Sequence, residues 1–338
     1  MTDPLVSVVI ANHNYGDHLS DAIASVQAQT YSHWELIVVD DASTDDSVDI
    51  ARTAAPNATI IALDDNIGSL AAFSRGFAGS QGEIIATLDS DDWWHPEKLE
   101  RIVEAHQADP DLTQISHWFG PVDRDGVPVT GWSKNSRIRR WLKHDPNLST
   151  GDVHGVLLRW GRYSWGITSG LSWPREVVAQ ALAVDPKPRM GVDTYLTIAA
   201  AFQGRVGMVE GQLMGYRIHG RNVMGGSSDL SHRLRVRQNT AAVIDSWAEH
   251  SGEHQRYDLD SDIQYTLVRF LDGEPVSLAL RLAALARTVP ELIALRAQPA
   301  RGLVELIERS IMALHRGHGK KVITIGLNRW LRSLTTRP

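Results

Sequence analysis

The segment EIIATLDSDDWWHPEKLERIVEAHQ, residues 83–107, contains a complete strand-to-helix unit with acids at its centre. Residues 83–89 are mostly apolar and β-branched, which predicts a strand buried on both faces. Residues 95–107 carry apolar side chains at helical spacing, with Pro96 in the predicted first turn. The acids lie where the strand gives way to the helix: Asp89, Asp91 and Asp92.

The same strand-then-helix pattern occurs three more times before this segment. Buried strands are predicted at residues 5–11, 35–40 and 58–63, and helices at residues 15–30, 43–55 and 68–80. This alternation is typical of βαβ units, in which parallel strands form a sheet that helices cover. We therefore predict an α/β, Rossmann-like fold with a mostly parallel sheet flanked by helices.

The pattern changes after residue 110. Residues 113–132 predict two strands joined by a turn at Asp125-Gly126, a dipeptide that favours hairpins. Residues 205–219 predict a second strand pair. The remaining predicted elements are a strand, a turn and a helix after Pro174, a helix at residues 192–203, and mainly helical structure from Ser231 onward.

Composition restricts the class of protein. The chain has 338 residues, of which 43% are hydrophobic, enough for one large domain or two modest ones. It contains no Cys, which excludes disulfides and thiolate chemistry. No apolar run reaches the length of a membrane span, and the N-terminus has an acid where a signal peptide has basic residues. The sequence therefore predicts a cytoplasmic protein.

Charge is distributed unevenly along the chain. The first 100 residues contain 17 acidic and 3 basic side chains, a net of −14, and the remainder contains 23 acidic and 31 basic side chains, a net of +8. An acidic first third cannot attract a phosphate-rich ligand by net charge, but a bridging cation or backbone N–H groups can. The basic remainder could meet an anionic acceptor or a lipid surface, or it is simply an uneven solvated surface.

Polar side chains follow several of the predicted strands. Asp40 and Asp41 end the second strand, the three acids of residues 89–92 end the fourth, and Asn12 to Asn14 follow the first. Because ligands of open α/β sheets bind at the carboxyl ends of the strands, we expect these groups at one edge. Clustered carboxylates repel one another unless a cation lies between them. Oxygen ligands without Cys favour Mg²⁺ or Mn²⁺.

Three other interpretations of the acids stay open. Residues 89–100 place acids at positions one, three and twelve as a calcium EF-hand does, but Trp94 stands where that loop needs Gly, and a strand precedes it. Residues 41–45 resemble the Asp-x-Ser-x-Ser metal motif of adhesion domains, with Asp45 replacing the last Ser. The acids could also simply cap helices, since Asp is a common N-cap. The glycines of dinucleotide and P-loop motifs are missing.

Five motifs in order resemble family 2 glycosyltransferases with the GT-A fold: VSVVIANHN, QTYSHWELIVVDDASTDDS, DNIGSLAAFSRGFAGSQGEIIATLDSDDWWHPEKLE, GVDTYL and YRIHGRN. The resemblance covers about residues 4–225. It implies transfer of a sugar from a nucleotide-diphosphate donor to an acceptor hydroxyl, with inversion at the anomeric carbon. It also implies a GT-A domain at residues 1–225, with a nucleotide-sugar-binding half (1–110), an acceptor-binding half (111–225), and a helical region beyond (226–338).

The resemblance implies roles for individual residues. Donor binding falls to Ala11, Asn12, Asn14, Asp41, Gly68, Arg75, Asp91 and His219. Within that set, Asp41 would accept a hydrogen bond from the base, most simply uracil N3–H. Mg²⁺ or Mn²⁺ would be bound by Asp89, Asp91 and Asp92, with Asp92 the nearest match to the direct ligand. Asp193 is implied as the general base. The acceptor is expected to contact Trp93, Trp94, Ser169 and Gly170.

The sequence departs from the family pattern at two places. Phe73-Ser74 stand where the family often has Arg-Asn, so the phosphate contact is expected at Arg75 instead. Val192 precedes the implied base where an acid is common. Structural alternatives also stay open: Asp193 as a helix N-cap, His219 as a hydrogen bonder at a strand end, and one of the paired tryptophans as a core residue.

The sequence therefore predicts an inverting, metal-dependent glycosyltransferase using a uridine or thymidine diphosphate sugar. Its acceptor would be a glycan, glycolipid or small molecule in the synthesis of surface polysaccharide or another glycoconjugate, and nucleic acid is not an expected partner. The alternative is a non-catalytic protein that binds a metal or nucleotide sugar on the same scaffold. Residues 315–338 are basic and partly apolar, which favours a peripheral contact with anionic lipid, a docked helix or a partner contact.

Overall fold

The computed structural model describes residues 3–123, 125–128, 150–161, 166–184, 190–219, 229–294 and 299–325. The chain divides into two compact units. Unit 1 contains Met1–Leu157, Arg162–Gly220 and Val243–Gln255, and unit 2 contains Leu158–Gly161, Arg221–Ala242 and Arg256–Pro338. The predicted domain boundary at residue 225 stays a prediction, and each unit is described by itself.

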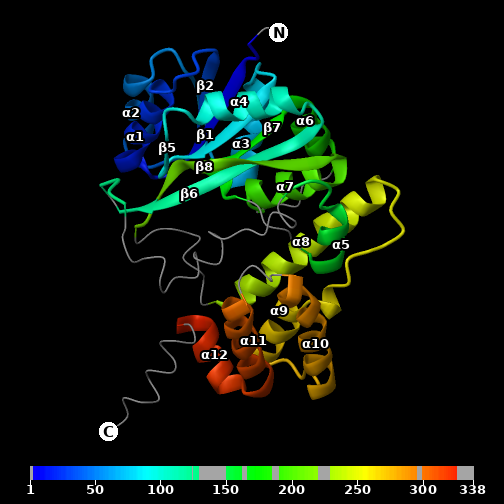
Figure 1. Ribbon diagram of the computed structural model, residues 1–338. Helices are drawn as coiled ribbons and strands as arrows, with labels where there is room; N and C mark the ends of the chain where they lie inside the picture. The colour runs from blue at the N-terminus through cyan, green and yellow to red at the C-terminus, as the bar shows by residue number, and fades with distance from the viewer. Residues whose placement is uncertain are drawn as a thin grey trace. The chain divides into compact units, whose positions relative to one another are not determined.

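Unit 1 is built on a mixed sheet (Figure 1). Its strands are β1 (Val6–Asn12), β2 (Trp34–Asp40), β3 (Thr59–Ala62), β4 (Ile84–Asp89), β5 (Trp93–Trp94), β6 (Leu112–Val122), β7 (Leu171–Pro174) and β8 (Arg205–Arg217). Their order among the described residues is β3-β2-β1-β4-β7-β6-β8-β5. The first four strands pair in parallel, and β7 is antiparallel to both its neighbours. The predicted α/β class is therefore confirmed.

Helices cover the sheet of unit 1. They are α1 (Gly16–Gln27), α2 (Ser47–Ala54), α3 (Ser69–Gly79), α4 (Lys98–Ala108), α6 (Arg175–Ala183) and α7 (Val192–Gln203). Helix α5 (His154–Trp160) is divided between the two units. The apolar run of β1 is explained by burial on both faces, since Val8 and Val9 are both fully inaccessible. A Cβ at Gly76 of α3 would lie 2.3 Å from Val9 Cγ1, so only glycine lets this helix approach β1 so closely.

The segment between β4 and α4 differs from the prediction. Helix α4 begins at Lys98 after the N-cap Glu97, so Pro96 precedes the helix instead of lying in its first turn. The strand β5 between them was not predicted. It pairs antiparallel with β8, and the His95 N–H continues this ladder by donating to the Leu213 carbonyl at 2.9 Å. A two-residue strand leaves too short a pattern to be recognised by alternation.

Two predicted strand pairs are also corrected. Residues 205–217 form the single strand β8, in which Gly211 has φ 115°, a left-handed conformation that suits glycine. Strand β8 pairs with β6 in parallel, with register shifts along the pair. At the predicted hairpin, Gly126 donates its N–H to the Asp123 carbonyl, but the return is a single bridge between Val122 and Pro128. The rest of the predicted second strand lies outside the described residues.

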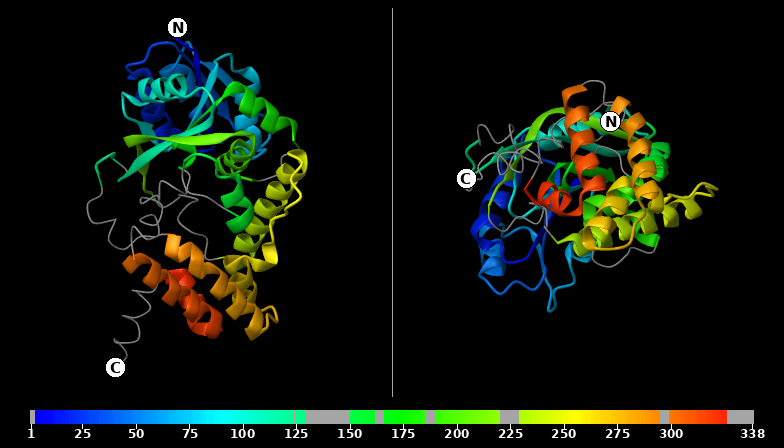
Figure 2. Two further views of the ribbon diagram at one scale, coloured as in Figure 1. Left: turned by 45° about the vertical axis from the view of Figure 1, so that its right-hand side comes forward. Right: turned by 90° about the horizontal axis from the view of Figure 1, so that it is seen from below.

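Unit 2 is helical, as predicted. Its helices are α9 (Ile263–Asp272), α10 (Leu278–Ala294), α11 (Pro299–Leu314), α12 (Arg316–Ile325) and the first part of α8 (Leu230–His250). Helix α9 packs against α10, α11 and α12, which Figure 2 shows from two directions. At the N-terminus of α9, the Asp262 carboxylate accepts hydrogen bonds from the Tyr265 N–H, the Arg237 guanidinium and the Tyr257 hydroxyl. Side-chain capping thus fixes the start of this helix.

The basic C-terminal segment is partly a docked helix. Val322 of α12 is 3% exposed, and a Cβ at Gly319 would lie 2.7 Å from Leu271 Cδ2 of α9. Residues 316–325 therefore pack within unit 2, and the remaining residues of the predicted lipid-binding segment, 326–338, lie outside the described part. Over the described residues, no helix has both the length and the apolar character needed to cross a membrane.

Candidate functional site

The carboxyl ends of three parallel strands meet at one edge of the sheet in unit 1. In the strand register, Asn12 of β1 pairs with Asp40 of β2, and Ala11 of β1 pairs with Asp89 of β4. Parallel strands in register deliver their last residues side by side, so the predicted meeting of these polar groups is confirmed. Two acidic groups result: the β2-end cluster, which is Asp40 and Asp41, and the β4-end cluster, which is Asp89, Asp91 and Asp92.

Asp40 in the β2-end cluster is bonded entirely within the protein. It is 3% exposed. One carboxylate oxygen accepts from Asn12 Nδ2 at 2.9 Å and from the Ser43 hydroxyl at 2.6 Å, and the other accepts from the Ser43 N–H at 2.8 Å. These bonds join the ends of β1 and β2 to the loop after β2.

Asp41 holds the start of α3. Its two carboxylate oxygens accept the N–H groups of Ile67 and Gly68 at 2.8 and 2.9 Å. Gly68 precedes α3 with φ 87°. The structure thus brings together two of the predicted donor residues, Asp41 and Gly68. A base N3–H would have to share one of these occupied oxygens, because each oxygen already accepts one backbone donor.

The loops after β1 and β2 are held in left-handed conformations. Asn14 has φ 60° and Ala42 has φ 58°, a conformation that a non-glycine residue adopts only when its surroundings impose it. The Asn14 side-chain oxygen accepts the Thr44 N–H at 2.8 Å, which locks the two loops together. Asn12 Oδ1 is buried and has no hydrogen-bond partner among the described residues. It is an acceptor available to a ligand donor.

In the β4-end cluster, Asp92 ties two segments of the chain together. It is 1% exposed, and its carboxylate accepts from the Ser169 hydroxyl at 2.6 Å and from the Arg217 N–H at 3.0 Å. The Ser169 hydroxyl in turn accepts the Asp89 N–H at 3.0 Å. Both oxygens of Asp92 are therefore engaged within the protein, whereas the sequence indicated Asp92 as the nearest match to the direct metal ligand.

Lys98 lies beneath this cluster and was not among the site residues predicted from the sequence. Its side chain is fully buried, its ammonium donates to the Ser169 carbonyl at 2.7 Å, and it lies 3.5 Å from the centre of the Trp94 ring. The Trp94 indole N–H donates to the same carbonyl at 2.8 Å. Burial lowers the pKa of Lys98 well below its ordinary value, although the Asp92 carboxylate opposes this shift.

The residues expected to contact an acceptor are mostly internal. Trp94 is 1% exposed and Ser169 is fully buried, and Gly170 is buried beside it, so these three support the cluster from below and offer no surface to an acceptor. The structural alternative, that one tryptophan packs in the core, therefore holds for Trp94. Trp93 is only partly buried, its ring lying against Gly215. Arg75 is exposed on α3.

Asp91 faces a histidine from the end of β8. The Asp91 carboxylate lies 2.9 Å from His219 Nε2, and the two side chains are 16% and 8% exposed. Residues 128 positions apart in sequence are thereby joined. A carboxylate oxygen and an imidazole nitrogen are both ligands that Mg²⁺ or Mn²⁺ accepts. Of the three predicted metal ligands, Asp91 is the one directed at a further potential ligand.

The electrostatics of the β4-end cluster favour a cation. Burial raises the pKa of Asp89 and of Asp92 well above the ordinary value, and the neighbouring Asp91 carboxylate raises both further. Hydrogen bonds from Thr168 to Asp89 and from Ser169 to Asp92 lower these pKa values without cancelling the increase. Charges held this close with few donors would be relieved by a bound cation.

Asp193 lies near this cluster on another element. It is the second residue of α7, whose N-cap is Gly191. Its carboxylate accepts the Thr194 N–H at 2.7 Å, burial raises its pKa, and its charge adds to the raised pKa of Asp89. The N-cap alternative is wrong as to position, although Asp193 does satisfy a backbone N–H of the first turn. The structure brings Asp193 close enough to Asp89 for the two charges to interact.

The described residues do not form a complete metal site by themselves. Within the described residues, no group of three or more His, Cys, Asp or Glu side chains is placed to hold a metal ion. Asp91 and His219 provide two ligands, so a metal there would take its remaining ligands from solvent or from a bound molecule.

Lys98 and Arg217 were not identified from the sequence. The only available signals were that Lys98 is one of three bases in the first 100 residues, and that Arg217 immediately precedes the IHG segment.

Known proteins resemble this chain in sequence. The family model "Glycosyl transferase family 2" matches residues 7–159. An uncharacterized glycosyltransferase of Nostoc sp. is 34% identical over 275 residues, covering 78% of this chain and 82% of that protein. The succinoglycan biosynthesis protein ExoO of Rhizobium meliloti is 32% identical over 201 residues, covering 59% of this chain and 56% of that protein. The chain thus spans most of the first relative and about half of the second.

Solved structures share the fold. The S. aureus TarS fragment 1–349 in complex with UDP-GlcNAc has a TM-score of 0.57 and 14% identity, covering 97% of this chain and 92% of that one. The mannosyltransferase PcManGT from Pyrobaculum calidifontis, in complex with GDP-Man and Mn²⁺, has a TM-score of 0.52 and 17% identity, covering 98% and 88%. At these identities the likeness concerns the fold alone.

Proposed function

This chain belongs to glycosyl transferase family 2, and we propose that it transfers a sugar from a nucleotide-diphosphate donor to an acceptor hydroxyl with inversion at the anomeric carbon. The observation that carries the proposal is the 2.9 Å approach of the Asp91 carboxylate to His219 Nε2 beside two buried carboxylates of raised pKa. This arrangement supports a binding position for a divalent cation at the edge of the sheet where ligands of such folds bind.

Asp91 and His219 would hold Mg²⁺ or Mn²⁺, and the donor diphosphate would complete the ligand set. When bound, the metal neutralises the charge that develops on the departing nucleotide. The Mn²⁺ in the structure of PcManGT supports this, since the two chains share a fold. Asp89 and Asp92 contribute their charge nearby, while the bonds of Asp92 to Ser169 and Arg217 fix the loop that carries Asp91.

Asp193 would be the general base. An inverting transfer needs the acceptor hydroxyl to lose its proton as the new bond forms, and a carboxylate within reach of that hydroxyl accepts it. Its position near the N-terminus of α7 favours the ionised form that a base requires, while burial opposes it. The charge interaction with Asp89 supports a location facing the donor site.

The donor base is proposed to be uracil or thymine. Either base offers one N3–H donor, and two acceptors lie at the carboxyl ends of β1 and β2. They are the Asp41 carboxylate and Asn12 Oδ1, which is buried and without a partner among the described residues. The neighbours with known donors include one with UDP-GlcNAc and one with GDP-Man. Tighter binding of a guanosine diphosphate than of a uridine diphosphate would contradict this part of the proposal.

The product is proposed to be a polysaccharide or another glycoconjugate, supported by the relative named for succinoglycan biosynthesis. The acceptor would then be a glycan, a glycolipid or a small molecule. Peripheral contact with anionic lipid would involve the basic residues beyond α12, since α12 itself is docked. Liposome flotation of the full chain and of a chain ending at Ile325 tests this, and equal flotation of both would count against it.

The test of the main proposal is a screen of nucleotide-diphosphate sugars against the full chain. We expect Mn²⁺-dependent thermal stabilisation by one donor, and release of nucleoside diphosphate that depends on an added acceptor and stops with a chelator. Stabilisation without acceptor-dependent release would favour the alternative, a non-catalytic protein that binds nucleotide sugars. A product with retained anomeric configuration would overturn the inverting mechanism.

A further inference from the structure

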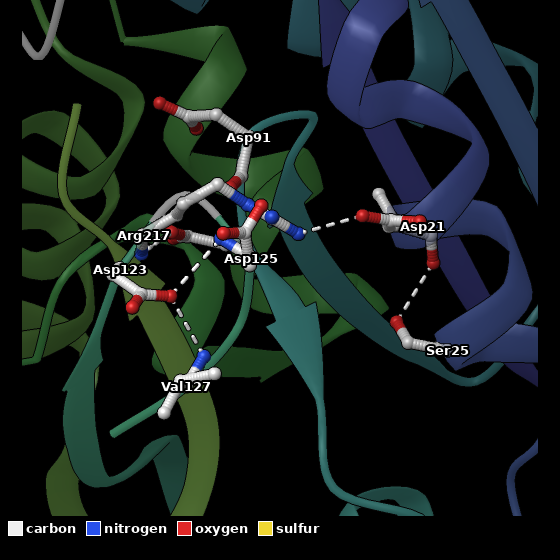
Figure 3. A network of polar contacts seen from close by, with 9 residues as sticks. Asp21, Ser25, Asp91, Asp123, Asp125, Val127 and Arg217 are labelled. Atoms are coloured by element: carbon white, nitrogen blue, oxygen red, sulfur yellow. Dashed lines mark hydrogen bonds and ion pairs between the residues drawn. The ribbon is translucent and has the colours of Figure 1, made fainter. Parts of the chain in front are cut away.

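Arg217 connects the loop that carries Asp91 and Asp92 to the surface of α1. Its side chain is 3% exposed, and its Nε donates to the Asp91 carbonyl at 3.0 Å, while its backbone N–H donates to the Asp92 carboxylate at 3.0 Å. One of its Nη groups meets the Asp21 carboxylate of α1 at 2.9 Å. Figure 3 shows the Arg217 side chain between Asp91 on one side and Asp21 on the other. Arg217 thus holds the backbone of Asp91 in place by hydrogen bonding.

The ring of His219, two residues after Arg217, also lies against α1. Its centroid is 5.3 Å from that of His18, with the planes 27° apart, and 5.4 Å from that of Tyr15. His18 is buried, with 4% of its surface exposed. Stacked rings restrict rotation about the side-chain bonds, so these contacts limit where His219 Nε2 can point.

The two contacts come from one face of α1. Tyr15, His18 and Asp21 are spaced three residues apart at the start of this helix, the spacing that places side chains on the same side. The same face therefore holds both of the groups that face each other across the proposed cation site: the backbone of Asp91, through Arg217, and the ring of His219, through His18. Packing alone would not require an exposed carboxylate such as Asp21, whose side chain is 58% exposed.

We propose that α1 is a positioning element of the donor site: Asp21 fixes Arg217, and the His18 ring fixes His219, so that Asp91 and His219 stay within reach of one divalent cation. This inference rests on the proposed function. It assigns roles to Asp21, His18 and Arg217 as positioning residues, acting through Asp91 and His219. Residues that orient metal ligands in this way typically change metal affinity 10- to 100-fold when they are lost.

The test uses the full chain and Mn²⁺ as the probe, measured by electron paramagnetic resonance with and without UDP. Four variants are compared: His18→Leu, His18→Phe, Asp21→Asn and Asp49→Asn. The last is a control, because Asp49 is an exposed carboxylate of another helix, α2, where it pairs with Arg52 at 3.5 Å. His18→Phe keeps an aromatic ring for stacking, and His18→Leu removes it. Thermal unfolding with a chelator reports the stability of each variant without metal.

We expect His18→Leu to weaken Mn²⁺ binding at least about tenfold, and His18→Phe to stay within about threefold of the wild type. Asp21→Asn should weaken binding about two- to fivefold, because an exposed carboxylate contributes little to an ion pair. Asp49→Asn should bind as the wild type does. With substrates, the donor KM should rise more than kcat falls, since the metal holds the diphosphate and the base is untouched.

Wild-type Mn²⁺ affinity in both His18→Leu and Asp21→Asn would overturn the inference. An equal loss in His18→Leu and His18→Phe would also overturn the stacking role, because both would then act through the lost imidazole. If His18→Leu does not fold, Asp21→Asn against Asp49→Asn still decides. No Mn²⁺ binding by the wild-type chain would instead refute the proposed function, and this inference with it.

Discussion

The two acidic clusters at the edge of the sheet have similar sequences and different surroundings. In the β2-end cluster, Asp40 and Asp41 accept hydrogen bonds from the chain itself, including three backbone N–H groups. In the β4-end cluster, Asp89 and Asp92 have raised pKa values, and Asp91 faces His219. Both clusters end buried parallel strands that are neighbours of β1.

From this difference we infer that the donors around a carboxylate, more than the number of acids, decide whether it favours a bound cation. Backbone N–H groups stabilise an ionised carboxylate and fix a loop at the same time. The carboxylates of the β2-end cluster therefore fix the loop after β2 and the start of α3. In the β4-end cluster, Asp92 has hydrogen-bond donors, but the three carboxylates still repel one another. This cluster therefore suits a site that binds a cation together with the substrate.

The largest effect on the rate of transfer should come from Asp193, whose charge interacts with Asp89 of the β4-end cluster. We expect Asp193→Asn to reduce transfer about 10²–10⁴-fold, because the amide cannot take a proton. The amide oxygen can still accept the Thr194 N–H, so the melting temperature and Mn²⁺-dependent donor binding should stay close to those of the wild type. Turnover and thermal unfolding are the measurements. Near-normal turnover would show that the base lies elsewhere.

The comparison of the clusters is tested directly by matched variants at their centres. Asp91→Asn should weaken Mn²⁺ binding by more than the 10- to 100-fold typical of residues that only support a ligand. Asp41→Asn should leave Mn²⁺ affinity within about twofold, because the Asp41 carboxylate is bonded to Ile67 and Gly68. Titration of each variant with Mn²⁺ decides this. Equal losses in the two variants would remove the distinction between the clusters.

The pH dependence of turnover should reflect Asp193. Burial raises the pKa of its carboxyl above the ordinary 3.8, so the protonated, inactive form persists to a higher pH than for an exposed Asp. At saturating donor and Mn²⁺, kcat should fall about tenfold per pH unit below that raised pKa. The residual activity of Asp193→Asn should lack this acidic limb. An unchanged limb in the variant would assign it to another group.

The smallest effect on Mn²⁺ binding, and a larger one on stability, is expected at Asp41. In Asp41→Asn, one carboxylate oxygen becomes an NH₂ group, which cannot accept the N–H of Ile67 or Gly68. A buried N–H without a partner costs about 1–3 kcal/mol. Denaturant unfolding of the variant measures this loss, with Asp49→Asn as the exposed control. An Asp41→Asn variant as stable as the wild type would mean that the loop before α3 has other support.

Local pattern was enough for the regular parts of the fold. The β-branched runs of β1, β2 and β4 and the helical spacing of Leu19, Ile23 and Val26 in α1 gave the correct element types, because burial on both faces or on one face leaves a periodic trace. The two-residue strand β5 was missed, and residues 205–217 were predicted as a strand pair instead of the single strand β8. Strand β5 forms by pairing with β8, and β8 pairs with β6 along most of its length; pairing between distant segments leaves no local period.

The sequence by itself determined the α/β class, the family and the strand ends that carry the acids, since these follow from periodicity and from ordered motifs. Only the tertiary structure decided which acid faces what. It turned Asp92 inward to Ser169 and Arg217, set Asp91 against His219, and placed Lys98 and Trp94 beneath them. The reason is physical: a carboxylate's role depends on the donors and charges around it, and these come from segments far apart in the chain.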